Sequence, residues 1–203
     1  MTDNVPKGSD AVRHLERKYL KYDPWNFSTN VYELIRHRVM VEFTLYNQPQ
    51  KVLDLGCGEG HFLQMLLSSE PALKAVGVDF IETAANRARA CLINHSVTIV
   101  NQDISDFLTS HPLGKDIYDV IVLGEILYYV EKQKIDFIID AVKRILSPKG
   151  TVLLSHYNPD IPEFNEWILK KFENKPFVRD KQITLDPFDF GKWVVTLERI
   201  KTS

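Results

Sequence analysis

Residues 51–60 have the sequence KVLDLGCGEG, and the fold class can be predicted from them. A short apolar run, 51–55, predicts a buried strand, and 62–68 has the spacing of a helix. Between them, glycines alternate at Gly56, Gly58 and Gly60. Glycine allows positive φ angles and lets a ligand approach the backbone where a Cβ would intrude. Such a loop at the carboxyl end of a strand lines the crevice in which open α/β sheets bind ligands. The stretch therefore predicts a ligand-binding loop rather than a plain tight turn.

The rest of the chain repeats this alternation of short apolar runs and amphipathic stretches. Further strands are expected at 75–79, 97–100, 118–123 and 151–156, and helices at 82–94 and 132–146. Strands that alternate with helices of this length imply right-handed crossovers and a parallel sheet covered on both faces. Near the end, 182–185 and 193–200 have no helix between them, and we expect an antiparallel pair that closes the sheet edge.

The first 49 residues differ from this pattern. Segments 11–22 and 30–46 carry apolar residues at helical spacing, and Pro24 interrupts them because it restricts the preceding residue. Asn30 and Glu33 resemble a capping box at the start of the second helix. We therefore expect a short N-terminal helical lid over 1–49 and a single main domain over 50–203.

Composition excludes several classes of protein. The chain has 203 residues, of which 44% are hydrophobic, and 25 basic residues against 27 acidic ones give a formal charge of −2. Because the chain has no excess of positive charge to hold a phosphate backbone, binding to nucleic acid is not expected. Two isolated cysteines argue against a disulfide framework and a zinc site, so no metal is expected. The apolar run at 120–123 is far too short for a membrane span, and the N-terminus lacks an apolar signal core. A cytoplasmic protein with no membrane partner is expected.

Acidic residues identify the kind of ligand. Asp54, Asp79, Asp103 and Glu125 each end or follow a predicted strand, so they meet at one edge of the sheet. The dinucleotide fingerprint needs glycine where His61 stands, and the loop has no basic residue for a phosphate. Four carboxylates would repel a pyrophosphate and would suit a cation that carries hydroxyl and amino groups.

S-adenosylmethionine has these features: a sulfonium, an ammonium, a ribose diol and an adenine. At the tip of the neighbouring strand, Asp79 can accept both ribose hydroxyl protons, as an acid does in dinucleotide folds. Phe80 offers its ring to the adenine, and Asp103 can accept from the exocyclic amine. The cofactor predicted from these residues is S-adenosylmethionine, with S-adenosylhomocysteine as its product.

The ordered set of 52–60, 77–79, 102–104 and 118–122 resembles the class I S-adenosylmethionine-dependent methyltransferases. The resemblance implies an α/β fold with a Rossmann-like, mostly parallel seven-stranded sheet in the order 3-2-1-4-5-7-6 and an antiparallel closing strand. It also implies a role for each part of the cofactor site. Asp54, with the backbone at Gly56, Cys57 and Gly58, would hold the methionine end, and Asp79 would hold the ribose. Asp103 and Ile104 would hold the adenine, and the carbonyls near Leu123 and Gly124 would face the ammonium.

A narrower resemblance lies in 22–27 (YDPWNF), in Tyr32 and Glu33, and in 124–130 (GEILYYV). These segments are similar to the nodulation protein S type of methyltransferase. That family N-methylates an amino sugar at the end of a deacetylated chitooligosaccharide. The resemblance implies a small-molecule acceptor that is methylated at nitrogen.

Catalytic candidates follow the fourth and fifth strands. Glu125, Tyr128 and His156 are predicted at their carboxyl ends, although Glu125 can equally be a helix-start acid and His156 an ordinary buried histidine. A protein base is not required for an amine near neutrality, whereas a hydroxyl acceptor needs one. In the lid, Trp25 and Tyr32 can offer the acceptor a stacking surface, or Trp25 can simply pin the lid.

The predicted function is transfer of a methyl group to a small molecule, at the nitrogen of an amino sugar or a similar amine. Two alternatives stay open. One is an O-methyltransferase that acts on a small metabolite, and the other is a non-catalytic protein that only binds the cofactor. The chain is expected to act as a monomer or homodimer.

Overall fold

The computed structural model describes residues 8–111, 117–157, 162–175, 177–185 and 195–202. The strands are β1 (Lys51–Leu55), β2 (Lys74–Asp79), β3 (Val97–Asn101), β4 (Tyr118–Gly124), β5 (Leu146–Tyr157), β6 (Phe177–Leu185) and β7 (Val195–Thr202). The helices are α1 (Gly8–Lys18), α2 (Val31–Leu45), α3 (His61–Ser69), α4 (Glu82–Cys91), α5 (Ile104–Ser110), α6 (Lys132–Ile145) and α7 (Pro162–Glu173), with one 3-10 turn, η2 (Leu127–Tyr129). Among the described residues, no helix is both long enough and apolar enough to cross a membrane.

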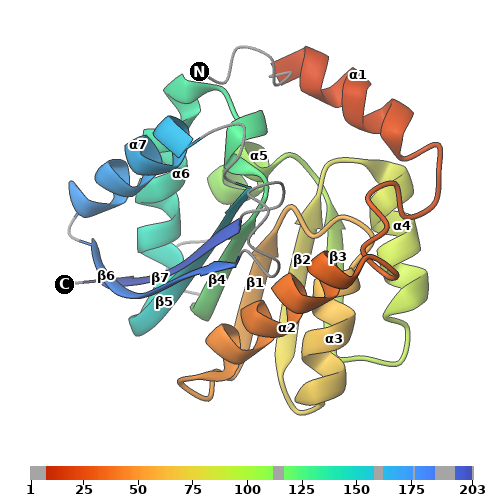
Figure 1. The fold of residues 1–203 in the computed structure, drawn as a ribbon, viewed down its shortest axis with the longest axis horizontal. Helices are drawn as coiled ribbons and strands as arrows, with labels where there is room; N and C mark the ends of the chain where they lie inside the picture. Colours follow the sequence, from red (N-terminus) through yellow and green to blue (C-terminus); the bar gives the residue numbers. More distant parts are fainter. Residues whose placement is uncertain (1–7, 112–116, 158–161, 176, 186–194, 203) are drawn as a thin grey trace.

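The strands form one seven-stranded sheet in the order β3-β2-β1-β4-β5-β7-β6. The pairs from β3 to β5 are parallel, and β7 runs antiparallel to both of its neighbours, β5 and β6. The sequence prediction of the sheet order and of the antiparallel closing strand is confirmed. Figure 1 shows the sheet with helices on both of its faces.

Each face of the sheet is covered by a separate apolar layer. On one face, Val52 and Leu153 pack with residues of α2, α3 and α4. On the other face, Leu53 and Leu154 pack with residues of α5, α6 and α7. Successive side chains of a strand point to opposite faces, so a strand covered on both faces is apolar at nearly every position. This is why the predicted strands appear as continuous apolar runs.

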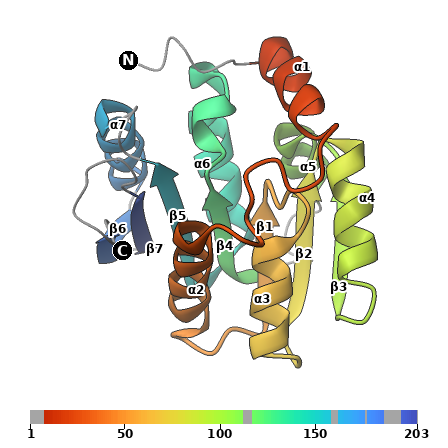
Figure 2. The same ribbon diagram turned by 45° about the vertical axis from the view of Figure 1, so that its right-hand side comes forward.

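Parallel pairing brings the carboxyl ends of β1, β2, β3 and β4 to one edge of the sheet, where the glycine loop lies. At this edge α1 and the segment after it cross from the α4 side toward α2 (Figure 2). A small third cluster joins Leu15 and Tyr19 of this segment to Ile81 and Ala84, at the start of α4. The fold therefore places the N-terminal segment over the loops that follow the parallel strands.

Several element boundaries differ from the sequence prediction. The first helix ends at Lys18 instead of residue 22, and a turn with positive φ at Asp23 and Asn26 follows it. Asn30 caps α2 by accepting from the Tyr32 N–H, but Glu33 pairs with Arg36 instead of reaching back to complete a capping box. The helices α5 and α7 were not predicted, and the first residues of the strand expected at 193–200 lie outside the described residues.

The core under α7 generates a test of the fold. Phe172 is fully buried, and its ring meets the ring of Phe177 edge-on at 5.4 Å between centroids. We expect Phe172→Ala to lower the free energy of unfolding by about 3–5 kcal/mol, because the substitution leaves a cavity. Chemical denaturation measures the loss, and Val178→Ala on the neighbouring exposed surface is the control. A loss no larger than the control's would contradict this packing.

Candidate functional site

A cavity of about 810 Å³ opens at the carboxyl ends of the parallel strands. Its walls come from the loops after β1, β2, β3 and β4, from α1 and the segment after it, and from α2. Of the predicted site residues, those that line the cavity are Trp25, Asp54, Gly56, Cys57, Gly58, Asp79, Phe80, Asp103, Ile104, Gly124, Glu125 and Tyr128. The structure thus brings residues from six separate elements to one hollow of the size that small ligands occupy.

The glycine loop is fastened to the end of β2. The N–H groups of Gly56 and Cys57 both donate to the Val78 carbonyl, at 2.8 and 3.0 Å. The Gly58 N–H donates to Asp79 Oδ2 at 2.8 Å. Gly56 has a φ of +86°, and a Cβ there would lie 2.2 Å from Ile126 Cγ2. Only glycine fits this position, because a residue with a side chain would be strained at this φ and its Cβ would clash with Ile126.

Two buried carboxylates lie beside the loop. Burial raises the pKa of Asp79 to about 6, against the hydrogen bonds that it accepts from Ile81 and Gly58. Burial, followed by the charge of Asp79, raises the pKa of Asp54 to about 7, while Arg36 acts to lower it. Near neutral pH these groups hold negative charge at a cost in free energy, and a cation or a set of hydroxyl donors would reduce that cost.

Other cofactor candidates have a role of their own in the fold. Asp103 caps α5, because its Oδ1 accepts from the N–H groups of Ser105 and Asp106 at 2.7 and 3.4 Å. Burial, with the nearby charge of Asp79, raises the pKa of the Cys57 thiol well above its usual value. A thiol in this state is not a nucleophile at neutral pH, so Cys57 contributes packing and its backbone.

Glu125 forms a polar cluster after β4. It has a positive φ of 58°, which is unusual for a residue other than glycine. Ser155 Oγ donates to its Oε1 at 2.6 Å, and Tyr128 Oη donates to its Oε2 at 3.1 Å. The Glu125 N–H also donates to the Ser155 carbonyl at 3.0 Å. These bonds hold one carboxylate of the cavity wall in a fixed orientation.

Three predicted residues do not line the cavity, namely Tyr32, Leu123 and His156. His156 is buried on the opposite side of β5 from Ser155, because neighbouring strand residues point to opposite faces. Burial lowers the pKa of His156 to about 4. His156 therefore lies away from the described cavity, and Ser155 is the residue of β5 that contacts Glu125.

Aromatic side chains of the N-terminal segment cover the cavity. Trp25 and Phe27 stack with 5.7 Å between ring centroids, and Tyr19 meets Trp25 edge-on at 5.2 Å. A Cβ at Gly58 would lie 2.8 Å from Tyr19 Oη, so this phenol lies directly over the glycine loop. Tyr19 was missed from the sequence, although the four-residue spacing of Ala11, Leu15 and Tyr19 marks the buried face of this segment.

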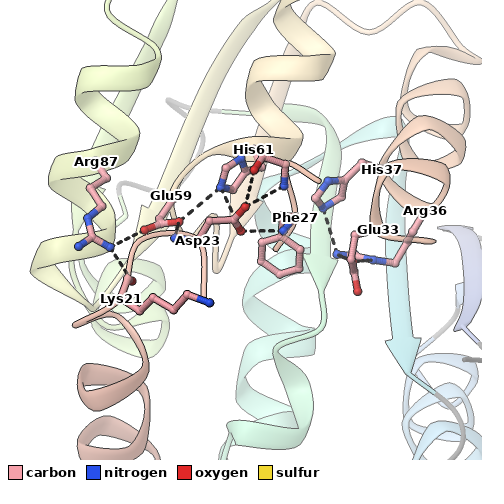
Figure 3. Close-up of polar contacts among 10 residues, drawn as sticks. Lys21, Asp23, Phe27, Glu33, Arg36, His37, Glu59, His61 and Arg87 are labelled. Carbon is pink, nitrogen blue, oxygen red and sulfur yellow. Dashed lines mark hydrogen bonds and ion pairs between the residues drawn. The ribbon is translucent and has the colours of Figure 1, made fainter. Parts of the chain in front are cut away.

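A polar network fastens this segment to the loop (Figure 3). Glu59 accepts from the Asp23 N–H at 2.9 Å and pairs with Arg87 of α4 at 2.6 Å. Asp23 accepts from the N–H groups of Phe27 and Ser28, and His61 Nε2 lies 3.7 Å from Asp23 and 3.4 Å from Glu59. The ligand atoms of Asp23, Glu59 and His61 lie within 4.8 Å of one another. Since backbone N–H groups and the Arg87 cation already occupy the two carboxylates, we interpret the group as a structural tie rather than a metal site.

A second polar group on α2 was also missed. Arg36 and His37 are buried and line the cavity beside Glu33. Burial and the adjacent Arg36 cation lower the pKa of His37 well below its usual value, so its ring is neutral and can accept the Arg36 Nη2 proton at 3.0 Å. Their position on the inner face of α2 was not evident from a helix with apolar residues nearly all round.

The sheet order, the glycine loop after β1 and the carboxylate at the end of β2 define the class I S-adenosylmethionine-dependent methyltransferase fold. A family model described as Nodulation protein S matches residues 8–163. The chain therefore belongs to the Nodulation protein S family, and the resemblance predicted from the sequence is confirmed.

Individual relatives include methyltransferases whose names give different acceptors, a protein lysine in one and a malonyl-[acyl-carrier protein] in another. A Nodulation protein S from Sinorhizobium fredii is 31% identical over 118 residues, which are 58% of this chain and 52% of that protein. A protein-lysine N-methyltransferase, efm4, from Schizosaccharomyces pombe is 32% identical over 159 residues, which are 70% of this chain and 64% of that protein. The chain thus spans less than two thirds of the length of each.

Among solved structures, the N-methyltransferase NodS from Bradyrhizobium japonicum in complex with S-adenosylhomocysteine is similar in fold. Its TM-score is 0.79 at 20% identity, over 94% of this chain and 97% of that one. At this identity the likeness concerns the fold alone.

The tie at Asp23 can be tested directly. Burial acts to raise the pKa of Asp23, but hydrogen bonds from Ser28 and Phe27 outweigh it and lower that pKa. We expect Asp23→Asn, which tolerates the positive φ, to cost about 1–3 kcal/mol because buried donors lose their acceptor. Hydrogen exchange at the Phe27 and Ser28 amides should accelerate by the corresponding factor.

The matched control is Asp10→Asn, which changes an exposed acid of α1. Equal exchange rates at residues 27 and 28 in the Asp23→Asn variant and in the parent would contradict the tie.

Proposed function

We propose that the protein transfers the methyl group of S-adenosylmethionine to the nitrogen of a small acceptor, an amino sugar or a similar amine. The observation that carries the proposal is the pair of buried carboxylates, Asp54 and Asp79, at a glycine loop in a chain of the Nodulation protein S family. When bound, the cofactor supplies the methyl group of its sulfonium, and the rest of the cofactor leaves as a neutral thioether.

The residues of the cavity fit this cofactor. Each oxygen of Asp79 accepts one backbone N–H and keeps a further lone pair for a ribose hydroxyl. Phe80 and Ile104 line the cavity beside Asp79 and would hold the adenine between apolar surfaces. Asp54 and the backbone at Gly124 would face the ammonium of the methionine portion. The loop at Gly56 and Gly58 lets the cofactor approach without a Cβ.

Glu125 is the proposed partner of the acceptor amine. Its carboxylate is held by Ser155 and Tyr128, and it faces the same cavity as Asp54. An anion in this position attracts an amine and orients its lone pair, and alignment of this kind can supply roughly 7–11 kcal/mol of the barrier. Because an amine near its pKa already offers a free lone pair, no histidine base is needed.

The N-terminal segment, residues 1–49, is the proposed lid. Within its described part, Tyr19, Trp25 and Phe27 cover the cavity and would exclude water from the reacting atoms. Trp25 would also offer the acceptor an aromatic face, as sugars and amines often use. The remaining main domain, 50–203, would hold the cofactor. A cytoplasmic location and a monomeric or homodimeric state stay predictions.

An acceptor screen tests the proposal. Purified protein, S-adenosylmethionine and amines or amino sugars should yield methylated product and S-adenosylhomocysteine, detected by mass spectrometry. A hydroxyl acceptor and a lysine peptide serve as separate arms, because relatives differ in acceptor. Turnover of the peptide or the hydroxyl alone would replace the proposed acceptor, and binding without product from any arm would identify a non-catalytic cofactor-binding protein.

Removal of the Glu125 charge gives a sharper result. We expect Glu125→Gln to lower the transfer rate by roughly 10²-fold, a value typical of a lost positioning or proton-transfer group. Affinity for S-adenosylhomocysteine should stay within experimental error, as calorimetry would record. Glu131→Gln, at the outer rim of the same cavity, is the matched control. A rate equal to the parent's would remove Glu125 from the proposal.

Acidity of the site gives a pH dependence. The pKa of Asp79 is about 6 and that of Asp54 about 7 without ligand, and the cofactor needs both groups ionised. Affinity for S-adenosylhomocysteine should therefore rise with pH through this window and level off above it. Each pH unit below both pKa values costs about 1.4 kcal/mol per proton taken up.

The stability of the ligand-free chain should change in the opposite direction. A raised carboxyl pKa means that the folded chain binds protons more tightly than the unfolded chain, so stability falls as pH rises toward 7. Calorimetric titrations and unfolding curves measure the two trends. Asp79→Asn should weaken affinity at every pH and reduce its slope, and a flat affinity for the parent would be inconsistent with ionised Asp54 and Asp79 as ligands.

A further inference from the structure

The outward side of α2 is largely apolar. A helix that packs on a core with one face ordinarily carries polar residues on the opposite face, whereas a helix that is apolar all round is covered on every side. Val31, Ile35 and Val39 of α2 and its C-cap residue Tyr46 are four or seven residues apart, so they share the side opposite the buried face. Val31 is 50% exposed and Tyr46 is 59% exposed. The sequence of α2 is thus that of a helix with a second partner.

This side of α2 is open in the structure. Figure 1 and Figure 2 show α2 on the sheet beside α3, and no other described helix or strand lies in front of it. Val39 is only partly covered by the core, and Ile35 belongs to none of the described apolar clusters. Lys181 and Arg199 contact the Tyr46 ring at 4.3 Å from its centroid, which holds the ring at the edge of this face. The described fold therefore leaves the outward face of α2 without a cover.

Two charges of opposite sign lie on the same face. Arg38 and Glu42 are both exposed and are four residues apart on α2. This spacing permits an ion pair within a helix, although an acid that precedes the base is the more favourable order. In the part of the chain that the structure describes, neither residue takes part in an ion pair. Both charges are thus available to a partner that carries the complementary pair.

We propose that two copies of the protein associate through this face of α2, with the two helices antiparallel about a two-fold axis near residue 40. In such a contact each interaction occurs twice, because the same surface serves both copies. The axis brings Arg38 of each copy opposite Glu42 of the other, and it brings Ile35 opposite Tyr46. The face complements itself in charge and in apolar content, which favours a second copy over an unrelated partner.

The size of the face limits the strength of the dimer. A helix of 15 residues is about 22 Å long, and one side of it is at the small end of specific interfaces. We therefore expect a weak dimer, with a dissociation constant on the order of 10 μM. The inner face of the same helix carries Arg36 and His37 of the cavity wall, so the contact would hold one wall of each cavity in place.

Charge reversal tests the contact. Sedimentation velocity of the full chain, over concentrations from about 1 to 200 μM, should show conversion from monomer to dimer. Arg38→Glu places four acids at the axis, and Glu42→Arg places four bases there. Each variant alone should dimerise roughly 10- to 100-fold more weakly, because like charges then meet at both symmetric positions.

A mixture of the two variants gives the decisive result. Arg38→Glu and Glu42→Arg restore opposite charges to one another, so the mixture should form a heterodimer with about the affinity of the parent. The double variant Arg38→Glu/Glu42→Arg should likewise dimerise with itself. Glu16→Arg and Arg17→Glu, exposed residues of α1, are the matched controls and should dimerise as the parent does. Circular dichroism and melting curves report that each variant is folded.

Three outcomes would overturn the inference. They are a parent that stays monomeric over the whole range, a dimer that both single variants form as well as the parent, and a mixture that stays monomeric although each variant has lost self-association. Recovery of the dimer in the mixture and in the double variant would establish the contact. None of these results depends on the cofactor or the acceptor, so the proposed function is tested separately.

Discussion

The hydrogen bond from the Gly58 N–H to the carboxylate of Asp79 joins the two strands on which the site depends. Parallel pairing of β1 and β2 brings these residues to one edge of the sheet, and Gly56 and Cys57 add two bonds to the Val78 carbonyl. At Gly56 and Cys57 the loop is held by backbone groups alone, and at Gly58 it is held by the carboxylate of Asp79. Asp79 holds the loop, and it is also the residue to which the proposed function assigns the ribose diol.

The same loop also organises the segment that covers it. Glu59, the residue after Gly58, accepts from the Asp23 N–H and pairs with Arg87, and Asp23 in turn holds the turn at residues 27 and 28. These bonds thereby fix the position of the aromatic side chains over the cavity relative to the strand ends beneath them. The cavity is built as one unit from the N-terminal segment, the loop and α4, although these elements are far apart in the sequence.

Much of this arrangement was predictable because it depends on local patterns. Apolar runs identify strands that are buried on both faces, and residues that follow parallel strands must share an edge, which places Asp54, Asp79 and Glu125 together. Side-chain direction was harder to predict. Ser155 and His156 differ by one position in β5, and only the register of the strand decides which one meets Glu125. Tyr19 follows α1 and Arg36 lies on α2, and the docking of these two helices depends on contacts with residues far away in the sequence.

The tie between Glu59 and Asp23 has a thermodynamic consequence. Gly58 and Glu59 are adjacent, so whatever orders the loop also lowers the entropy that the covering segment loses when it docks. Linkage is reciprocal: a molecule that binds the loop more tightly when the segment is docked makes local opening of the segment rarer, by the same coupling free energy. For such a molecule, occupancy of the cavity and opening of the covering segment are therefore coupled parts of one equilibrium.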